Sequence, residues 1–176
     1  MRGLRHARLL AGVWLCATLL AGCAHRTTLM ETGIAGLPAR VELADTPFFP
    51  QTRYQCGPAA LATVLNARGV TIAPDALVPQ VYLPGREGSL QAEIIAAVRR
   101  QGLLAVAAEP ALDALLAEIA AGHPVLVLQN LGLNWLPRWH YAVAVGYDLA
   151  RQELVLRSGT EPRRSTPFGV YLNTWN

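Results

Sequence analysis

A single cysteine, Cys56, lies where the sequence predicts the start of a helix. It belongs to the stretch QTRYQCGPAALATVLNARG (residues 51–69), in which helix-forming residues follow Pro58 and Gly69 ends the run. The first N–H groups of a helix are unpaired and stabilise negative charge, which favours the thiolate, the nucleophilic form of cysteine. The spacing therefore predicts a helix over residues 56–68 with a reactive thiol at its mouth.

An imidazole beside such a thiol can take its proton, and His140 is the histidine best placed to do so. It opens the predicted strand HYAVAVGY (140–147), whereas His123 falls in the predicted turn AGHPV, and His6 and His25 belong to the N-terminal segment. We therefore expect His140 to act as the base and His123 to be a surface turn residue. The alternative is that His140 is only a structural residue at the end of a strand.

The first 23 residues, MRGLRHARLLAGVWLCATLLAGC, have the layout of a secretory signal, with a basic start, an apolar run and small residues. The apolar run is shorter than the roughly 20 residues that a transmembrane helix needs. The ending LLAGC resembles the lipobox of bacterial lipoproteins, which implies that Cys23 is acylated and becomes the N-terminus. Ala24 implies, by the same resemblance, transfer to an outer membrane. The alternative is an ordinary signal peptide or a short anchor.

The 176 residues are then divided into a signal peptide (1–22), a lipidated tether (23–46) and one domain (47–176) that faces the periplasm. Cys16 leaves with the signal and Cys23 carries lipid, so Cys56 is the one free thiol and has no disulfide partner. No His/Cys cluster indicates a metal site. Every cation is arginine, and the net charge of +3 equals the three arginines of the signal. A nearly neutral domain argues against nucleic acid as a partner.

The hydrophobic pattern predicts helices first and an antiparallel sheet last, which is an α+β fold. The predicted helices cover residues 56–68, 89–101 (with Ser89 as N-cap) and 110–121. The predicted strands cover residues 103–108, 124–129, 140–147 and 153–158. The last two strands flank the short connection 148–152, so we expect them to form a hairpin.

Four segments taken in order resemble the bacteriocin-processing peptidases that cut double-glycine leaders, a branch of the papain-like cysteine peptidases. They are PQTRYQCGPAALATVLN, GREGSLQAEIIAAVRRQGL, GHPVLVLQ and RWHYAVAVGYD. The resemblance implies a papain-like fold with helices packed on a C-terminal sheet. It also implies that Cys56 attacks the peptide carbonyl, that His140 transfers the proton and that Gln51 helps to hold the oxyanion. Gln55 is the nearer glutamine, but its position next to the nucleophile favours a loop role.

The residue that orients the imidazole departs from this pattern, because LRSGT stands where the family has an Asp-Pro pair. Asp148 cannot replace the aspartate, since eight residues of strand separate it from His140 by roughly 26 Å at about 3.3 Å per residue. The predicted hairpin instead brings Ser158 opposite His140, so we expect Ser158 to accept a hydrogen bond without charge. A weaker orienter predicts modest or specialised activity.

The C-terminus is the second departure, because the chain stops at FGVYLNTWN where the family is expected to complete another strand. The chain is therefore either naturally short or truncated, and a missing strand would leave an exposed edge. Trp135 and Trp139, in the loop before His140, either cap the core or form a wall of a groove for an extended peptide.

Three functions compete on this sequence. The first is a lipid-anchored cysteine peptidase that needs no cofactor, contacts the membrane through its anchor and acts on a peptide or protein. The second is a cell-wall amidase or acyl transferase with the same fold. The third is a non-catalytic peptide-binding module, which the missing aspartate favours.

Overall fold

The computed structural model describes residues 34, 36–51, 55–108 and 110–175, and a compact unit begins at Leu37 and ends at Asn176. The predicted signal peptide and Cys23 lie outside the described residues, so the lipidation site stays a prediction. In the part of the chain that is described, no helix has the length and apolar character to span a bilayer.

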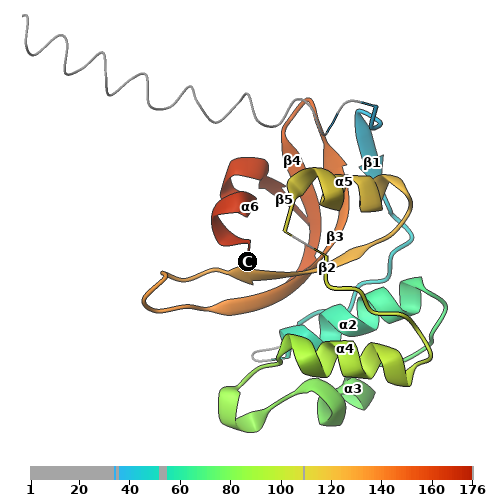
Figure 1. Ribbon diagram of the computed structural model, residues 1–176, viewed down its shortest axis with the longest axis vertical. Coiled ribbons are helices and arrows are strands. Elements are labelled where there is room, and N and C mark those ends of the chain that lie inside the picture. Colours follow the sequence, from blue (N-terminus) through green and yellow to red (C-terminus); the bar gives the residue numbers. More distant parts are fainter. Residues whose placement is uncertain (1–33, 35, 52–54, 109, 176) are drawn as a thin grey trace, which may run out of the picture. The chain divides into compact units, whose positions relative to one another are not determined.

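Three helices and a 3-10 turn form one layer (Figure 1). Helix α2 (Cys56–Ala67) begins at the predicted nucleophile, tolerates Pro58 in its first turn, and is followed by Gly69 at a positive φ of 84°. Helix α3 (Pro74–Val81), turn η3 (Pro84–Arg86) and helix α4 (Gln91–Arg100) follow. Helix α3 was not predicted, although Pro74 and Asp75 in its first turn are ordinary start signals.

The second layer is a curled antiparallel sheet of strands β1 (Arg40–Glu42), β2 (Val125–Asn130), β3 (Trp139–Asp148), β4 (Glu153–Ser158) and β5 (Glu161–Pro167). The strand order is β1-β3-β4-β5, and β2 also pairs with β3. The predicted β3–β4 hairpin is confirmed, with Asp148 opposite Glu153.

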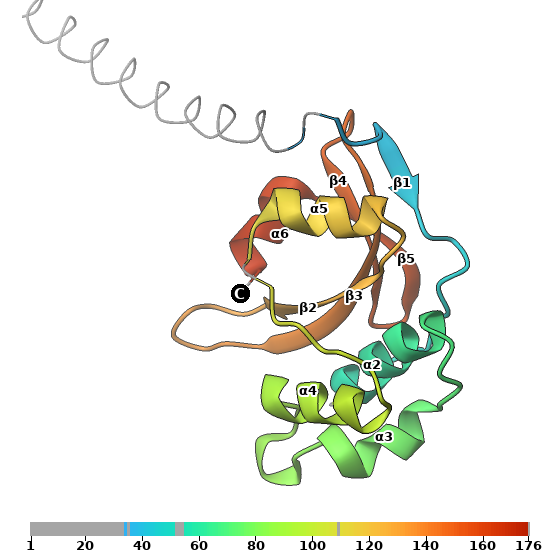
Figure 2. The same ribbon diagram turned by 45° about the vertical axis from the view of Figure 1, so that its right-hand side comes forward.

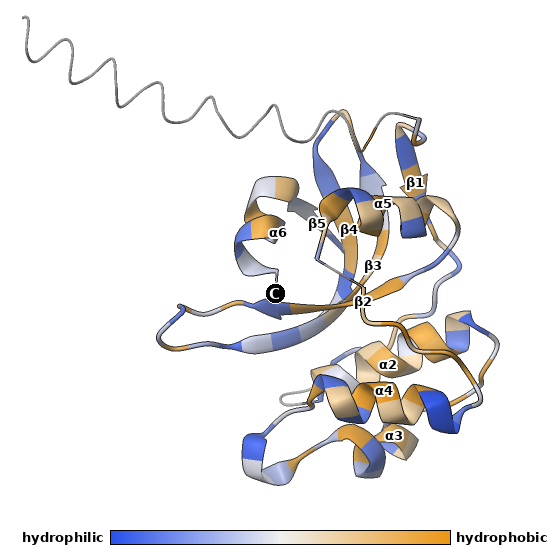
Figure 3. Cartoon of the chain, viewed as in Figure 1, coloured by the Kyte–Doolittle hydropathy of each residue, from blue (hydrophilic) through white to orange (hydrophobic). Residues whose placement is uncertain are grey.

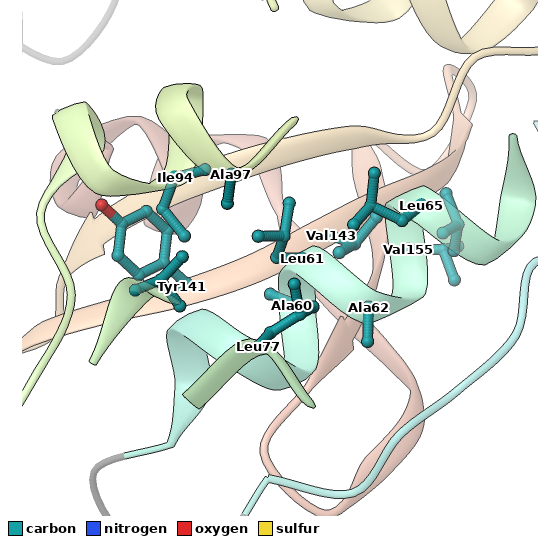
Figure 4. Close-up of a cluster of buried hydrophobic side chains, with 12 residues drawn as sticks. Ala60, Leu61, Ala62, Leu65, Leu77, Ile94, Ala97, Tyr141, Val143 and Val155 are labelled. Atoms are coloured by element: carbon teal, nitrogen blue, oxygen red, sulfur yellow. The ribbon is translucent and has the colours of Figure 1, made fainter. Parts of the chain in front are cut away.

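Strand alternation divides the core between the two faces of β3. Tyr141, Val143 and Val145 join the cluster built around Leu61 and Leu65 of α2 (Figure 4). The next buried residues along β3, Ala142 and Ala144, are not in that cluster, and helices α5 (Leu112–Ala120) and α6 (Phe168–Thr174) lie on their side of the sheet (Figure 2). Figure 3 shows the resulting apolar stripe along β3 and on α2 and α4.

Three sequence predictions differ from this fold. Residues 103–108 form no strand, and Leu104 and Val106 are 85% and 76% exposed, because no neighbouring strand pairs with this crossing between α4 and α5. Strand β1 lies inside the predicted tether, so the folded unit begins before residue 47. Beyond β4 the chain adds a strand that was not predicted, β5, and the C-terminal stretch that follows it forms a helix, Phe168–Thr174.

Candidate active site

Cys56 is the first residue of α2, is partly buried and is the one free cysteine among the described residues. Its neighbour Gly57 is required by packing, since a Cβ there would come within 2.6 Å of Ser89 Cβ. Ser89 therefore lies against the first turn of α2. The prediction that Ser89 caps α4 was wrong, because that helix begins at Gln91 with Leu90 as its N-cap and no side-chain cap bond.

His140 lies near the start of β3, and its Nε2 is 2.9 Å from the hydroxyl oxygen of Ser158 at the end of β4. Ser158 is 4% exposed, so this hydrogen bond is largely shielded from water. The structure thus brings together the two residues that the sequence paired as base and orienter. The engagement of Nε2 leaves Nδ1 as the ring nitrogen available to a thiol. Asp148 lies at the opposite end of β3, where it stands opposite Arg40 of β1 and Glu153 of β4 in the strand register.

The side-chain amide of Gln51 is hydrogen-bonded to backbone groups next to His140 and next to Ser158. Its Nε2 donates to the carbonyl of Tyr141 at 3.2 Å, and its Oε1 accepts from the N–H of Gly159 at 3.1 Å. A backbone bond of 2.9 Å from Gln51 N to Gly159 O adds a third link. Gln51 therefore ties the residue after His140 to the residue after Ser158. One N–H of its amide remains for another acceptor.

Cys56 and His140 are not hydrogen-bonded to each other in the described part of the chain. Cys56 lies near Tyr141 instead: burial raises the pKa of Tyr141, and the charge of a Cys56 thiolate raises it further. Catalytic hydrogen bonds are often long before substrate binds and tighten in the complex. The residues predicted for catalysis thus occupy neighbouring elements, with the thiol not yet engaged.

The pKa of His140 is lowered, first by burial of the imidazole and then by the positive charge of Arg164 on β5. Both causes disfavour the imidazolium. A carboxylate in the place of Ser158 would act in the opposite direction. The electrostatics of the site therefore favour a neutral imidazole in the resting protein.

Three polar groups near the mouth of α2 were missed by the sequence analysis. Tyr141 OH, Ser89 Oγ and Glu93 Oε2 are buried without a hydrogen-bond partner among the described residues. Tyr141 is 2% exposed, and burial together with the charges of Cys56 and Glu93 raises its pKa to about 12. In Figure 4 its hydroxyl points away from Leu61 and Val143. Only the alternation of β3 signals that the residue after His140 faces the helices.

Trp135 and Trp139 lie on the hairpin that connects β2 and β3, and they are 78% and 51% exposed. Trp139 directly precedes His140 and pairs with Asn130 across the hairpin. Their predicted role in binding substrate stays a prediction.

A surface hollow of about 370 Å³ lies elsewhere, around the C-terminal end of β3. Two of its arginines are paired with carboxylates, Arg163 with Glu42 at 2.8 Å and Arg151 with Glu153 at 3.1 Å. Neither Cys56 nor His140 lines it, so it is not the candidate active site. Among the residues that the structure describes, no group of His, Cys, Asp and Glu could hold a metal ion.

Comparison with known proteins bears on the family and on the fold. The model of a family described as Peptidase_C39 like matches residues 43–176. The crystal structure of a candidate C39-like peptidase from Bacillus anthracis matches with a TM-score of 0.64 and 17% identity, over 78% of this chain and 92% of that chain. At this identity the likeness concerns the fold alone. No curated protein matches the chain. The predicted α+β, papain-like fold is confirmed.

Proposed function

The chain belongs to the C39-like peptidase family, and from that premise we propose that it is a cysteine peptidase with Cys56 as nucleophile and His140 as base. The observation that carries the proposal is the 2.9 Å bond between His140 Nε2 and Ser158 Oγ, on a strand that neighbours the helix beginning at Cys56. Family membership supports a peptidase-type function, and the Cys-His mechanism is our proposal.

The proposed reaction begins when a bound peptide brings the thiol to Nδ1 of His140. The thiol proton passes to Nδ1, and the sulfur attacks the peptide carbonyl to form a C–S bond. The imidazolium returns the proton to the leaving amine as the C–N bond breaks. Water then loses a proton to Nδ1, attacks the thioester and releases the acid and the thiol. In this scheme the Nε2–H group of His140 donates a hydrogen bond to Ser158 Oγ throughout, and Ser158 is a positioning residue.

Gln51 has two proposed tasks. Its bonds to Tyr141 O and Gly159 N hold the His140–Ser158 pair in register. The remaining N–H of its amide would donate to the oxyanion of the tetrahedral intermediate. We therefore expect Gln51→Ala to reduce both the rate of acylation and the order of the His140 side chain.

We place the enzyme in the cell envelope, as a lipoprotein acylated at Cys23 that faces the periplasm, with the outer membrane favoured. This part of the proposal rests on the sequence of the first 24 residues. The resemblance described above makes peptides with a double-glycine leader the first substrates to test. Both are open to direct test, by mass spectrometry of the mature N-terminus and by the peptide assay below.

A non-catalytic peptide-binding module is the second candidate. It is favoured by the neutral residue at position 158 and by the absence of a hydrogen bond between Cys56 and His140 in the described chain. The amidase and acyl-transferase alternatives share the nucleophile and differ in their products.

The test uses the chain beginning at Ala24, in which Cys56 is the only thiol. Fluorogenic peptides containing Gly-Gly or Ala-Ala, and muropeptides, are incubated with the chain, and products are identified by mass spectrometry. Cleavage of peptides that is lost in Cys56→Ala and His140→Ala, and kept in the control His123→Ala, supports the proposal. Alkylation of Cys56 by iodoacetamide should likewise slow in His140→Ala and not in His123→Ala. Peptide binding that survives Cys56→Ala, with no product, would establish the binding module instead.

A further inference from the structure

The tip of the β2–β3 hairpin, residues 131–139, exposes an unusual amount of apolar surface. Five of the ten large apolar side chains that are exposed in the described chain lie within it: Leu131 at 46%, Leu133 at 57%, Trp135 at 78%, Leu136 at 60% and Trp139 at 51%. The hairpin projects from the body of the domain (Figure 1), and apolar and polar residues alternate along its end (Figure 3). A concentrated apolar patch of this kind marks a surface that meets an apolar partner.

The backbone of the tip is hydrogen-bonded within the tip itself. Leu133 and Leu136 exchange N–H to carbonyl bonds of 3.1 and 2.9 Å, and Leu131 N donates to Arg138 O at 2.9 Å. The side-chain oxygen of Asn130 accepts from the N–H groups of Gly132 and Arg138 at 3.0 and 2.9 Å. These bonds reduce the number of backbone polar groups that would lose water on entering lipid, where unpaired backbone groups are costly.

The charges around the tip fit the same partner. Residues 119–147 contain no aspartate or glutamate, and their only arginine is Arg138. No carboxylate therefore has to be desolvated or brought near an anionic surface. Tryptophan is enriched at the boundary between lipid and water, where Trp135 would lie. Arg138 would be attracted to anionic headgroups.

We propose that residues 131–139 form a membrane-docking tip that enters the interfacial layer of an anionic phospholipid bilayer. A projecting tight turn with exposed apolar side chains around it suits a fluid apolar medium. This contact is independent of acylation at Cys23 and of peptidase activity. Because His140 follows Trp139 directly, docking would hold the candidate active site close to the membrane surface.

The first test is flotation of the chain beginning at Ala24 with vesicles of phosphatidylethanolamine and phosphatidylglycerol in a 3:1 ratio. This chain retains the whole core, whose residues all follow position 42. The paired change Trp135→Ser and Leu136→Ser should lower the partition coefficient at least tenfold. The matched control, Val170→Ser and Leu172→Ser, removes exposed apolar side chains of 54% and 42% from α6 and should change it less than twofold. Circular dichroism checks that both variants are folded.

The second test measures insertion directly and also keeps the proposal falsifiable if the serine variant is unfolded. Trp139→Phe with Trp175→Phe leaves Trp135 as the one tryptophan of the chain that begins at Ala24. Its fluorescence should be quenched by brominated lipids in the same vesicles. Absence of flotation, equal flotation of hairpin and control variants, or unquenched Trp135 would overturn the proposal. A concentration-dependent dimer in sedimentation that only the hairpin variant loses, without vesicle binding, would assign the tip to self-association and also overturn it.

Discussion

The Nε2 atom of His140 lies 2.9 Å from the Oγ atom of Ser158. A carboxylate in this position can only accept a hydrogen bond, so it fixes the tautomer that carries hydrogen on Nε2 and leaves Nδ1 free to act as a base. A hydroxyl can accept or donate, and when it donates the hydrogen moves to Nδ1. Ser158 therefore orients the ring without fully selecting the reactive tautomer.

Replacement of Ser158 separates orientation from charge. Ser158→Ala removes a neutral hydrogen bond worth about 0.5–1.5 kcal/mol, so kcat/KM should fall by about twofold to twelvefold. Ser158→Asp should raise the pKa of His140, because a carboxylate stabilises the imidazolium and counters the burial that lowers this pKa. Titration of His140 by NMR and peptide hydrolysis measure the two effects. Ser165→Asp, on exposed β5, is the control. An unchanged pKa of His140 in Ser158→Asp would contradict the pairing.

Arg164 should tune the same imidazole through charge alone. Because its positive charge lowers the pKa of His140, Arg164→Gln should raise that pKa and move the acidic limb of the rate profile to higher pH. Arg163→Gln is the control, since Arg163 is adjacent on β5 but bonds Glu42. Both variants are titrated by NMR at low ionic strength. Equal shifts in the two variants would mean that the effect is not specific to Arg164.

Burial of His140 also predicts how stability depends on pH. Its pKa is lower in the folded protein than in the unfolded chain, so the unfolded state binds the proton more readily. The free energy of unfolding should therefore be highest above about pH 6.5 and fall as the pH drops below that value. His140→Gln should remove this part of the dependence. Urea unfolding of both proteins between pH 8 and 5 measures it, and parallel curves would contradict the prediction.

Glu42 provides an internal reference when the same unfolding series is continued to more acidic pH. Its pKa is lowered by the hydrogen bond and charge of Arg163, with a smaller contribution from Arg40. This stabilisation is present above the ordinary pKa of glutamate and is lost at more acidic pH. The Glu42 contribution is therefore lost at a lower pH than the His140 contribution, and it should be unchanged in His140→Gln.

Much of this architecture was readable because the relevant signals are local. Pro58 and Gly69 bracket α2, and the short turn before Glu153 fixes the β3–β4 hairpin that carries Ser158 to His140. The rise per residue of a strand was enough to exclude Asp148 as the residue that orients His140. The candidate nucleophile, base and orienter were therefore proposed from spacing together with the family resemblance.

The features of the fold that were not predicted depend on contacts between residues that are distant in sequence. Residues 103–108 have a strand-like composition, but pairing needs a neighbour that this crossing lacks. Strand β1 is only three residues long and is held by β3, so its own sequence carries little signal. The packing of Ser89 against Gly57 joins two segments more than thirty residues apart along the numbering. No local pattern could have predicted it.

Gly57 should be intolerant of a side chain for that reason. Gly57→Ala would force its Cβ into Ser89 at the first turn of α2, and overpacking of a buried site costs about 1–3 kcal/mol. The double variant Gly57→Ala with Ser89→Gly removes the obstructing side chain and should recover part of the loss. Gly169→Ala in α6 is the control, because a Cβ there meets nothing within 4 Å. Thermal and urea unfolding give the three differences. Additive losses in the double variant would mean that Ser89 is not the obstacle and that the first turn of α2 is constrained by another contact.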